Sequence, residues 1–233
     1  MQERTIKTFV KIGHRGAMGY EPENTLLSFK KALELGVDAI ELDVYACKTG
    51  ELVVIHDDKV DRTSNGKGYV IEKTFDELRA LDAGKGEKIP TLSEVLDLVN
   101  RKVKVNIELK GVGTAKPVSE LIKDYVDNKG WSFDDFIVSS FNHYELKEFG
   151  ELSPNVKIGA LIVGIPLGFA EFAEKLNAHS VNLCVEFINQ EFVDDAHKRG
   201  MKVYVWTVND ADEIRRMKSL GIDGIFSNFP DRL

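Results

Sequence analysis

Three carboxylates in strand-like apolar segments are the first residues of this sequence that point to chemistry. Glu41 and Asp43 stand two residues apart in Asp38–Val44, and Glu108 lies near the end of Val103–Leu109. Side chains alternate faces along a strand, so Glu41 and Asp43 point the same way. Crowded carboxylates in an apolar interior repel one another and lose hydration unless a cation lies between them. Three oxygen donors suit a hard ion, so we expect one divalent cation, Mg²⁺ or Ca²⁺.

Two histidines also follow strand-like segments. His14 comes after Val10–Gly13, and His56 comes after Glu51–Ile55. An imidazole titrates near neutral pH, so two of them can supply a general base and a general acid. A lone histidine is more often structural, but a pair beside a carboxylate cluster favours catalysis.

Two basic side chains accompany these groups. Arg15 directly follows His14, and Lys110 stands two residues after Glu108 and therefore shares its face. A guanidinium can bind two phosphate oxygens at once, and an ammonium acts as a point charge, so both suit an anionic substrate. The alternative is that the two cations only form salt bridges with the carboxylates.

The elements that must position these residues alternate along the chain. Short apolar segments of strand character are separated by amphipathic segments of helical periodicity, several of them ended by glycine. This alternation predicts a parallel sheet with right-handed crossovers, and eight units predict a closed (β/α)8 TIM barrel. Active sites of such barrels lie at the C-terminal ends of the strands, where the ionisable residues fall. The predicted strands are Val10–Gly13, Asp38–Val44, Val103–Leu109, Phe136–Ser139, Lys157–Ile162, Ser180–Leu183, Lys202–Trp206 and Asp223–Phe226.

The interval between the second and third predicted strands is longer than the others. It contains Glu51–Ile55, turn-rich segments and two helical stretches, Phe75–Leu81 and Leu92–Asn100. We interpret residues 57–102 as a small insertion at the barrel mouth, within a single domain that spans residues 1–233. A helix is also predicted from Gly168 to Leu176, and the final helix is expected to be short or absent.

Composition limits the partners of this chain. The 233 residues include 43% hydrophobic and 30% charged residues, and the net charge of −7 gives no electrostatic help in binding nucleic acid or anionic membranes. Met1–Thr8 has no apolar signal-peptide core, and no apolar run is long enough to span a membrane, so we expect a cytoplasmic protein. The sequence does not indicate an oligomeric state. We also expect no strongly apolar segment near the mouth.

These residues stand within a fixed series of short motifs, and the chain resembles the glycerophosphodiester phosphodiesterase family nearly end to end. The order of the motifs makes this resemblance specific. The motifs are Gly-His-Arg-Gly at 13–16, Pro-Glu-Asn-Thr at 22–25, Glu-Leu-Asp at 41–43, His-Asp at 56–57, Asp-Arg-Thr-Ser-Asn-Gly-Lys-Gly at 61–68, Ile-Pro-Thr-Leu at 89–92, Glu-Leu-Lys at 108–110, Ser-Ser-Phe at 139–141, Trp-Thr-Val-Asn at 206–209 and Gly-Ile-Asp-Gly-Ile at 221–225.

The resemblance implies a role for each candidate residue. A divalent ion would be held by Glu41, Asp43 and Glu108, with His14 and His56 as the acid–base pair. Arg15 and Lys110 would bind the phosphate, and Phe141 and Trp206 would line the glycerol or leaving-group pocket unless they are ordinary barrel packing. One departure stands out, because Ser227-Asn228 replaces the Thr-Asp that the family often carries there. The lost carboxylate is either peripheral or alters the substrate or metal site.

The expected reaction is metal-dependent hydrolysis of a small glycerophosphodiester to glycerol 3-phosphate and an alcohol. One histidine would deprotonate the glycerol 2-hydroxyl, which attacks phosphorus, while the other protonates the departing alcohol. Direct attack by water would use the same residues. Alternatives are a lysophospholipase-D-like or other phosphodiesterase, a Schiff-base aldolase that uses Lys110, and a non-catalytic phosphodiester-binding protein.

Overall fold

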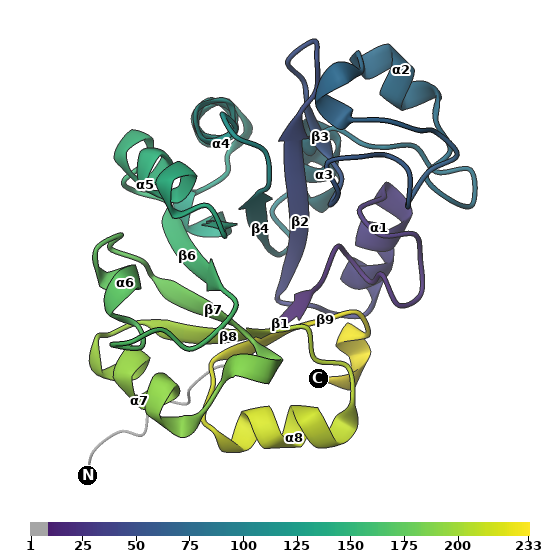
Figure 1. Cartoon of the computed structure of the whole chain (residues 1–233). Helices are drawn as coiled ribbons and strands as arrows, with labels where there is room; N and C mark the ends of the chain where they lie inside the picture. Colours follow the sequence, from purple (N-terminus) through teal and green to yellow (C-terminus); the bar gives the residue numbers. More distant parts are fainter. Residues whose placement is uncertain (1–8) are drawn as a thin grey trace.

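A computed structural model describes residues 9–233, so the expectation for Met1–Thr8 lies outside the described residues. Eight parallel strands close into a barrel, because β1 pairs with both β2 and β9 (Figure 1). The predicted TIM barrel is confirmed. The short β3 pairs antiparallel with β2 outside the barrel, with Val44 opposite Val54. The strands are β1 (Val10–Gly13), β2 (Ala39–Ala46), β3 (Leu52–Val54), β4 (Lys104–Leu109), β5 (Phe136–Ser140), β6 (Lys157–Ile162), β7 (Ser180–Cys184), β8 (Lys202–Trp206) and β9 (Gly224–Ser227).

Helices surround the barrel, and most begin at a side chain that caps the first turn. Thr74 and Thr91 each accept a hydrogen bond from the backbone three residues later, as the capping-box pattern predicts. Within residues 9–233, β9 is followed by a 3-10 turn, η4 (Pro230–Arg232). The helices are α1 (Leu26–Glu34), α2 (Phe75–Ala80), α3 (Leu92–Val99), α4 (Ala115–Lys129), α5 (His143–Leu152), α6 (Glu171–Glu174), α7 (Gln190–Lys198) and α8 (Ala211–Ser219).

The sequence prediction was wrong in the segment after β6. Only Glu171–Glu174 of the predicted helix 168–176 is helical, because Gly168 and Phe169 have positive φ angles of 80° and 49°. A loop therefore joins β6 to α6. No residue from 158 to 170 has a charged or polar side chain, so the expectation of no strongly apolar segment near the mouth was also wrong.

The barrel and the segment that follows β3 are packed by two different apolar clusters. The main core lies between the strands and the surrounding helices, and it includes α3 through Leu92, Leu96 and Val99. A second cluster joins Val53 of β3 to later residues, ending at Ile89. The division into one domain with an insertion at 57–102 stays a prediction. Although α3 falls within that range, it packs in the main core as a helix of the barrel. Within the described residues, no helix is long and apolar enough to cross a membrane.

The turn from β1 to α1 is held tightly against the helix. Thr25 is the N-cap of α1 and accepts a hydrogen bond from the backbone nitrogen of Ser28. Gly16 has φ +82°, and a Cβ atom there would lie 2.6 Å from the backbone carbon of Ser28. Only glycine fits both constraints, so the residues between Gly13 and Gly16 are fixed in place.

Replacing Gly16 by alanine should therefore destabilise the protein more than the same change at Gly36. Gly36 also has a positive φ, of 72°, but has nothing within 4 Å of an added Cβ. Gly36→Ala isolates the backbone cost of about 1–2 kcal/mol, whereas Gly16→Ala should lose about 1–3 kcal/mol more through overpacking. Chemical denaturation of both variants measures the difference. Equal losses would show that Ser28 moves aside freely.

Candidate active site

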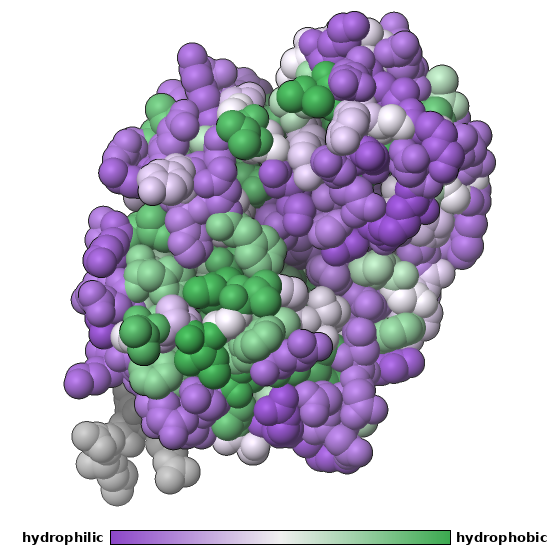
Figure 2. All heavy atoms as spheres, viewed as in Figure 1, coloured by the Kyte–Doolittle hydropathy of each residue, from purple (hydrophilic) through white to green (hydrophobic). Residues whose placement is uncertain are grey.

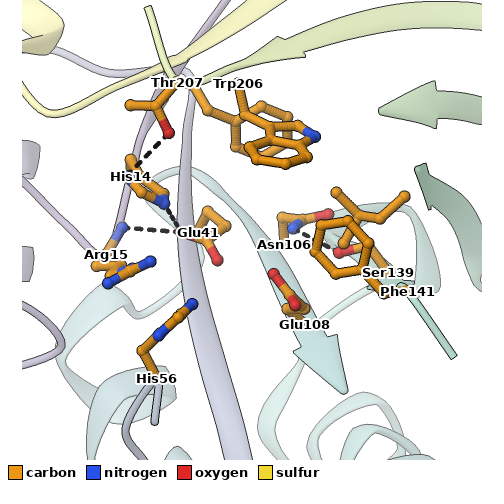
Figure 3. A pocket seen from close by; sticks show the side chains of 12 residues that line it. His14, Arg15, Glu41, His56, Asn106, Glu108, Ser139, Phe141, Trp206 and Thr207 are labelled. Atoms are coloured by element: carbon orange, nitrogen blue, oxygen red, sulfur yellow. Dashed lines mark hydrogen bonds and ion pairs between the residues drawn. The ribbon is translucent and has the colours of Figure 1, made fainter. Parts of the chain in front are cut away.

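The predicted site residues meet in one pocket at the C-terminal ends of the barrel strands (Figure 3). The pocket, with the open solvent at its entrance included, measures about 460 Å³. Seven of the nine candidates line it directly. The other two contact lining residues, Asp43 through Arg15 and Lys110 through Glu108. Its lining residues are His14, Arg15, Glu41, His56, Asn106, Glu108, Ser139, Phe141, Leu161, Trp206, Thr207 and Phe226.

Glu41, Asp43 and Glu108 form a buried acidic cluster. Parallel pairing of β2 with β4 places Asp43 opposite Glu108, and the three carboxylates offer oxygens within 4.8 Å of one another. Burial, with the charges of Asp43 and Glu108, raises the pKa of Glu41 well above its usual value. Burial and Asp43 likewise raise the pKa of Glu108 to about 7. The cluster thus holds more negative charge than its surroundings readily stabilise.

Two cations offset part of this charge. Arg15 donates its backbone N–H to Glu41, 2.8 Å away, and its Nε lies 3.4 Å from Asp43. Lys110 Nζ lies 2.9 Å from Glu108 and 4.0 Å from Asp43. Burial alone would lower the pKa of Lys110, but the charges of Glu108 and Asp43 outweigh it and raise that pKa. Arg15 and Lys110 therefore do form salt bridges with the carboxylates, as the alternative to phosphate binding predicted.

The donor set nevertheless fits a divalent cation. Among the described residues, Glu108 Oε1 is buried without a hydrogen-bond partner although it forms the ion pair with Lys110. Asn24 donates from Nδ2 to Asp43 Oδ2 at 2.9 Å and so orients that carboxylate. Oriented carboxylates with free lone pairs are what a hard ion such as Mg²⁺ or Ca²⁺ requires.

His14 is held from behind by a neutral amide. Its Nδ1 lies 2.7 Å from Asn228 Oδ1, so Nδ1–H donates to that oxygen and Nε2 is left 4.0 Å from Glu41 (Figure 3). Burial, together with the charge of Arg15, lowers the pKa of His14 to about 4. The departure at Asn228 is therefore not peripheral, because this side chain contacts one of the two histidines.

His56 is held from behind by a carboxylate. Its Nδ1 lies 2.6 Å from Asp57 Oδ1, and its Nε2 lies 3.2 Å from Lys110 Nζ. Arg62 donates two hydrogen bonds, of 2.7 and 3.0 Å, to Asp57. It donates two more to Glu23. Hydrogen bonds from Arg62 and His56 hold the pKa of Asp57 well below its usual value. Both histidines thus have Nδ1 fixed by a side chain behind the ring, and Nε2 of His56 also contacts Lys110.

Glu23 completes a chain of charges around the site. Its carboxylate binds Arg62 and also accepts from Arg15 Nη1 at 2.8 Å. Residue order alone does not reveal this role for Glu23 or Arg62, because the two are brought together by the fold. Both residues lie in motifs that carry the family resemblance, Pro-Glu-Asn-Thr at 22–25 and Asp-Arg-Thr-Ser-Asn-Gly-Lys-Gly at 61–68, and this was the sequence signal for them.

The aromatic candidates form the opposite wall. Phe141 and Trp206 meet edge to face with ring centres 5.4 Å apart, and Trp206 Nε1 donates to the carbonyl of Asn182. Asn106 and Ser139, which the sequence analysis missed, lie beside them and hydrogen-bond to each other at 2.9 Å (Figure 3). Asn106 stands two residues before Glu108 on β4, so strand alternation could have found it.

Breaking the Arg62 link should impair His56 without unfolding the protein. Arg62→Met removes the partner of both Asp57 and Glu23, so kcat should fall between about 10- and 100-fold through loss of positioning. Lys67→Met is the matched control, since Lys67 is exposed and pairs only loosely with Asp61 at 3.5 Å. Steady-state kinetics and thermal unfolding of both variants give the comparison. A kcat for Arg62→Met equal to that of Lys67→Met would contradict the role.

Asn228→Asp should shift the pH dependence of the reaction. A carboxylate next to His14 Nδ1 favours the imidazolium, so the pKa of His14 should rise from about 4. If His14 must be neutral, the acidic limb of kcat/KM then moves to higher pH. Asn228→Ala removes the contact without adding charge and should not move the limb upward. Superimposable profiles for wild type and Asn228→Asp would rule out this coupling.

Comparisons with known proteins identify the family of this chain. The sequence profile of the glycerophosphoryl diester phosphodiesterase family matches residues 14–232. A glycerophosphodiester phosphodiesterase of Caldanaerobacter subterraneus subsp. tengcongensis is 41% identical over 98% of this chain and 97% of its own length. A human lysophospholipase D is 26% identical over 95% of this chain and 84% of its own. The structure of an Oleispira antarctica phosphodiesterase in complex with the product sn-glycerol-3-phosphate superposes with a TM-score of 0.86, at 31% identity over 95% of this chain and 93% of the other. The chain therefore belongs to the glycerophosphoryl diester phosphodiesterase family, whose members are phosphoric diester hydrolases.

Proposed function

We propose that this protein hydrolyses glycerophosphodiesters to glycerol 3-phosphate and an alcohol, with one divalent cation and with His14 and His56 as the acid–base pair. The observation that carries the proposal is the pairing of two histidines, each fixed at Nδ1, with a buried carboxylate cluster in one pocket. The product bound to the Oleispira relative supports the same products here.

Glu41, Asp43 and Glu108 would hold the cation, which when bound polarises a phosphate oxygen and lowers the pKa of a nearby hydroxyl. Mg²⁺ and Ca²⁺ both suit three carboxylates. Arg15 and Lys110 add positive charge at the same end of the barrel and would bind the phosphate. Phe141 and Trp206 offer aromatic surface to the carbon atoms of the substrate.

The two histidines divide the proton transfers. The one that begins neutral removes the proton of the attacking hydroxyl, and the other protonates the departing alcohol. The attacking group is either the glycerol 2-hydroxyl, which gives a cyclic phosphate that water then opens, or water itself. A diester that lacks the 2-hydroxyl separates the routes, because only attack by water permits its turnover.

Two alternatives fit the site less well. A Schiff-base reaction needs a neutral amine, but Glu108 and Asp43 raise the pKa of Lys110 and keep it protonated. A non-catalytic binding protein needs no acid–base pair, yet both histidines are present and positioned. A cytoplasmic location belongs to the same proposal, and the two free cysteines, Cys47 and Cys184, are typical of a reducing compartment.

The test is release of glycerol 3-phosphate from glycerophosphocholine and glycerophosphoethanolamine with Mg²⁺, with Ca²⁺ and with excess EDTA. We expect release with at least one ion and loss of at least 100-fold in EDTA and in His14→Ala, since general acid–base catalysis contributes about 10²–10⁴-fold. His179→Ala is the matched control, because His179 directly precedes β7 and therefore lies at the end of the barrel opposite the pocket. Activity that survives EDTA would remove the cation from the proposal, and no release from any glycerophosphodiester would overturn it.

A further inference from the structure

The mouth of the barrel has an apolar half outside the catalytic pocket. Six exposed apolar side chains lie in loops that follow the C-terminal ends of β4 to β7, and we call them the apolar rim. Leu167 is fully exposed and Val112 is 82% exposed, although burial is the usual fate of such residues. The apolar rim consists of Val112, Phe141, Val163, Ile165, Leu167 and Phe187.

The opposite half of the mouth is charged. Loops after β1 and β3 carry Glu23, Asp57 and Arg62 in their network, and Lys85 pairs with Glu21 beside them. Figure 2 shows this division, with hydrophobic surface on one side of the central hollow and hydrophilic surface on the other. A gathered apolar surface beside a site is characteristic of binding rather than of ordinary exposure.

The apolar rim is continuous with the pocket. Phe141, Leu161 and Trp206 line the pocket on this side, and Phe141 belongs to both surfaces. Leu161 lies on β6, from which the chain passes directly into the uncharged loop that carries Val163, Ile165 and Leu167. A hydrocarbon chain attached to a diester in the pocket could thus leave the phosphate site without crossing a charged group.

We propose that the apolar rim binds one hydrocarbon chain of the substrate, so that the preferred diesters are single-chain, lysophospholipid-like molecules. The inference rests on the proposed function, because it places the phosphate in the same pocket. Attachment to a membrane surface is less compatible with this protein, since the chain carries a net charge of −7, which anionic lipids repel.

The experiment compares choline release from glycerophosphocholine with release from octanoyl-glycerophosphocholine, a soluble lysophospholipid, with the activating cation present. We expect kcat/KM to be at least tenfold higher for the octanoyl substrate, equivalent to about 1.4 kcal/mol and to about two fully buried methylenes. The octyl ester of glycerol 3-phosphate carries its chain on the leaving alcohol instead and is the control for the position of the chain. A preference for the octanoyl substrate supports the proposal, whereas a preference for the octyl ester alone contradicts it.

Leu167→Ser should lower the ratio of the two kcat/KM values at least threefold, and the combined Val163→Ser, Ile165→Ser and Leu167→Ser variant should bring it near one. Leu152→Ser is the matched control, since Leu152 is 47% exposed but lies at the far end of α5. Leu167 is fully exposed, so its replacement should leave thermal unfolding unchanged.

The outcomes separate this inference from the proposed function. Hydrolysis of glycerophosphocholine with no preference for the octanoyl substrate, or a ratio that Leu167→Ser leaves unchanged, overturns the inference alone. A preference seen only with substrate in phosphatidylcholine vesicles also overturns it and identifies a membrane-docking surface. Failure to hydrolyse any of the three diesters overturns the proposed function together with the inference.

Discussion

Repulsion among three buried carboxylates is the constraint on which the rest of the site depends. Their oxygens lie within 4.8 Å of one another at the end of the barrel, where little water can screen them. Arg15 and Lys110 offset part of the charge, yet the pKa of Glu108 still rises to about 7. Without a cation the cluster would therefore compete for protons near neutral pH, which gives a divalent ion a strong electrostatic reason to bind.

Side-chain hydrogen bonds fix the two histidines beside this cluster. His14 and His56 are each fixed through Nδ1, but one partner is the amide of Asn228 and the other is the carboxylate of Asp57. The two imidazoles consequently lie in different electrostatic settings, although their hydrogen-bond patterns are alike. Acid and base roles are commonly divided in this way, since environment rather than residue type sets the direction of proton transfer.

Charged and apolar side chains at the barrel mouth come from loops after different strands. Loops after β1 and β3 supply most of the charges, while loops after β4 to β7 supply the exposed apolar side chains. The parallel fold brings all these loops to one end, so a single substrate can contact both halves. The acidic cluster and the histidines lie in the pocket between them.

The sequence by itself predicted the barrel and nine candidate site residues. Strand alternation and the position of polar residues at strand ends are local properties, and they indicated seven of the nine, while the family resemblance added Phe141 and Trp206. The prediction failed in the segment after β6. The helix predicted from residue 168 does not begin until Glu171, because Gly168 and Phe169 have positive φ angles, so residues 168–170 belong to the apolar loop.

Only the tertiary structure decided which neighbours act on each site residue. Asn228 reaches His14 across 214 positions of the chain, and Arg62 reaches Glu23 across 39. Closure of the barrel, in which β1 pairs with β9, brings Asn228 to His14, and the packing of the segment after β3 against β2 and β3 brings Arg62 to Glu23. Hydrogen bonds and pKa shifts depend on separations of a few ångströms, which residue order does not specify until the chain is closed.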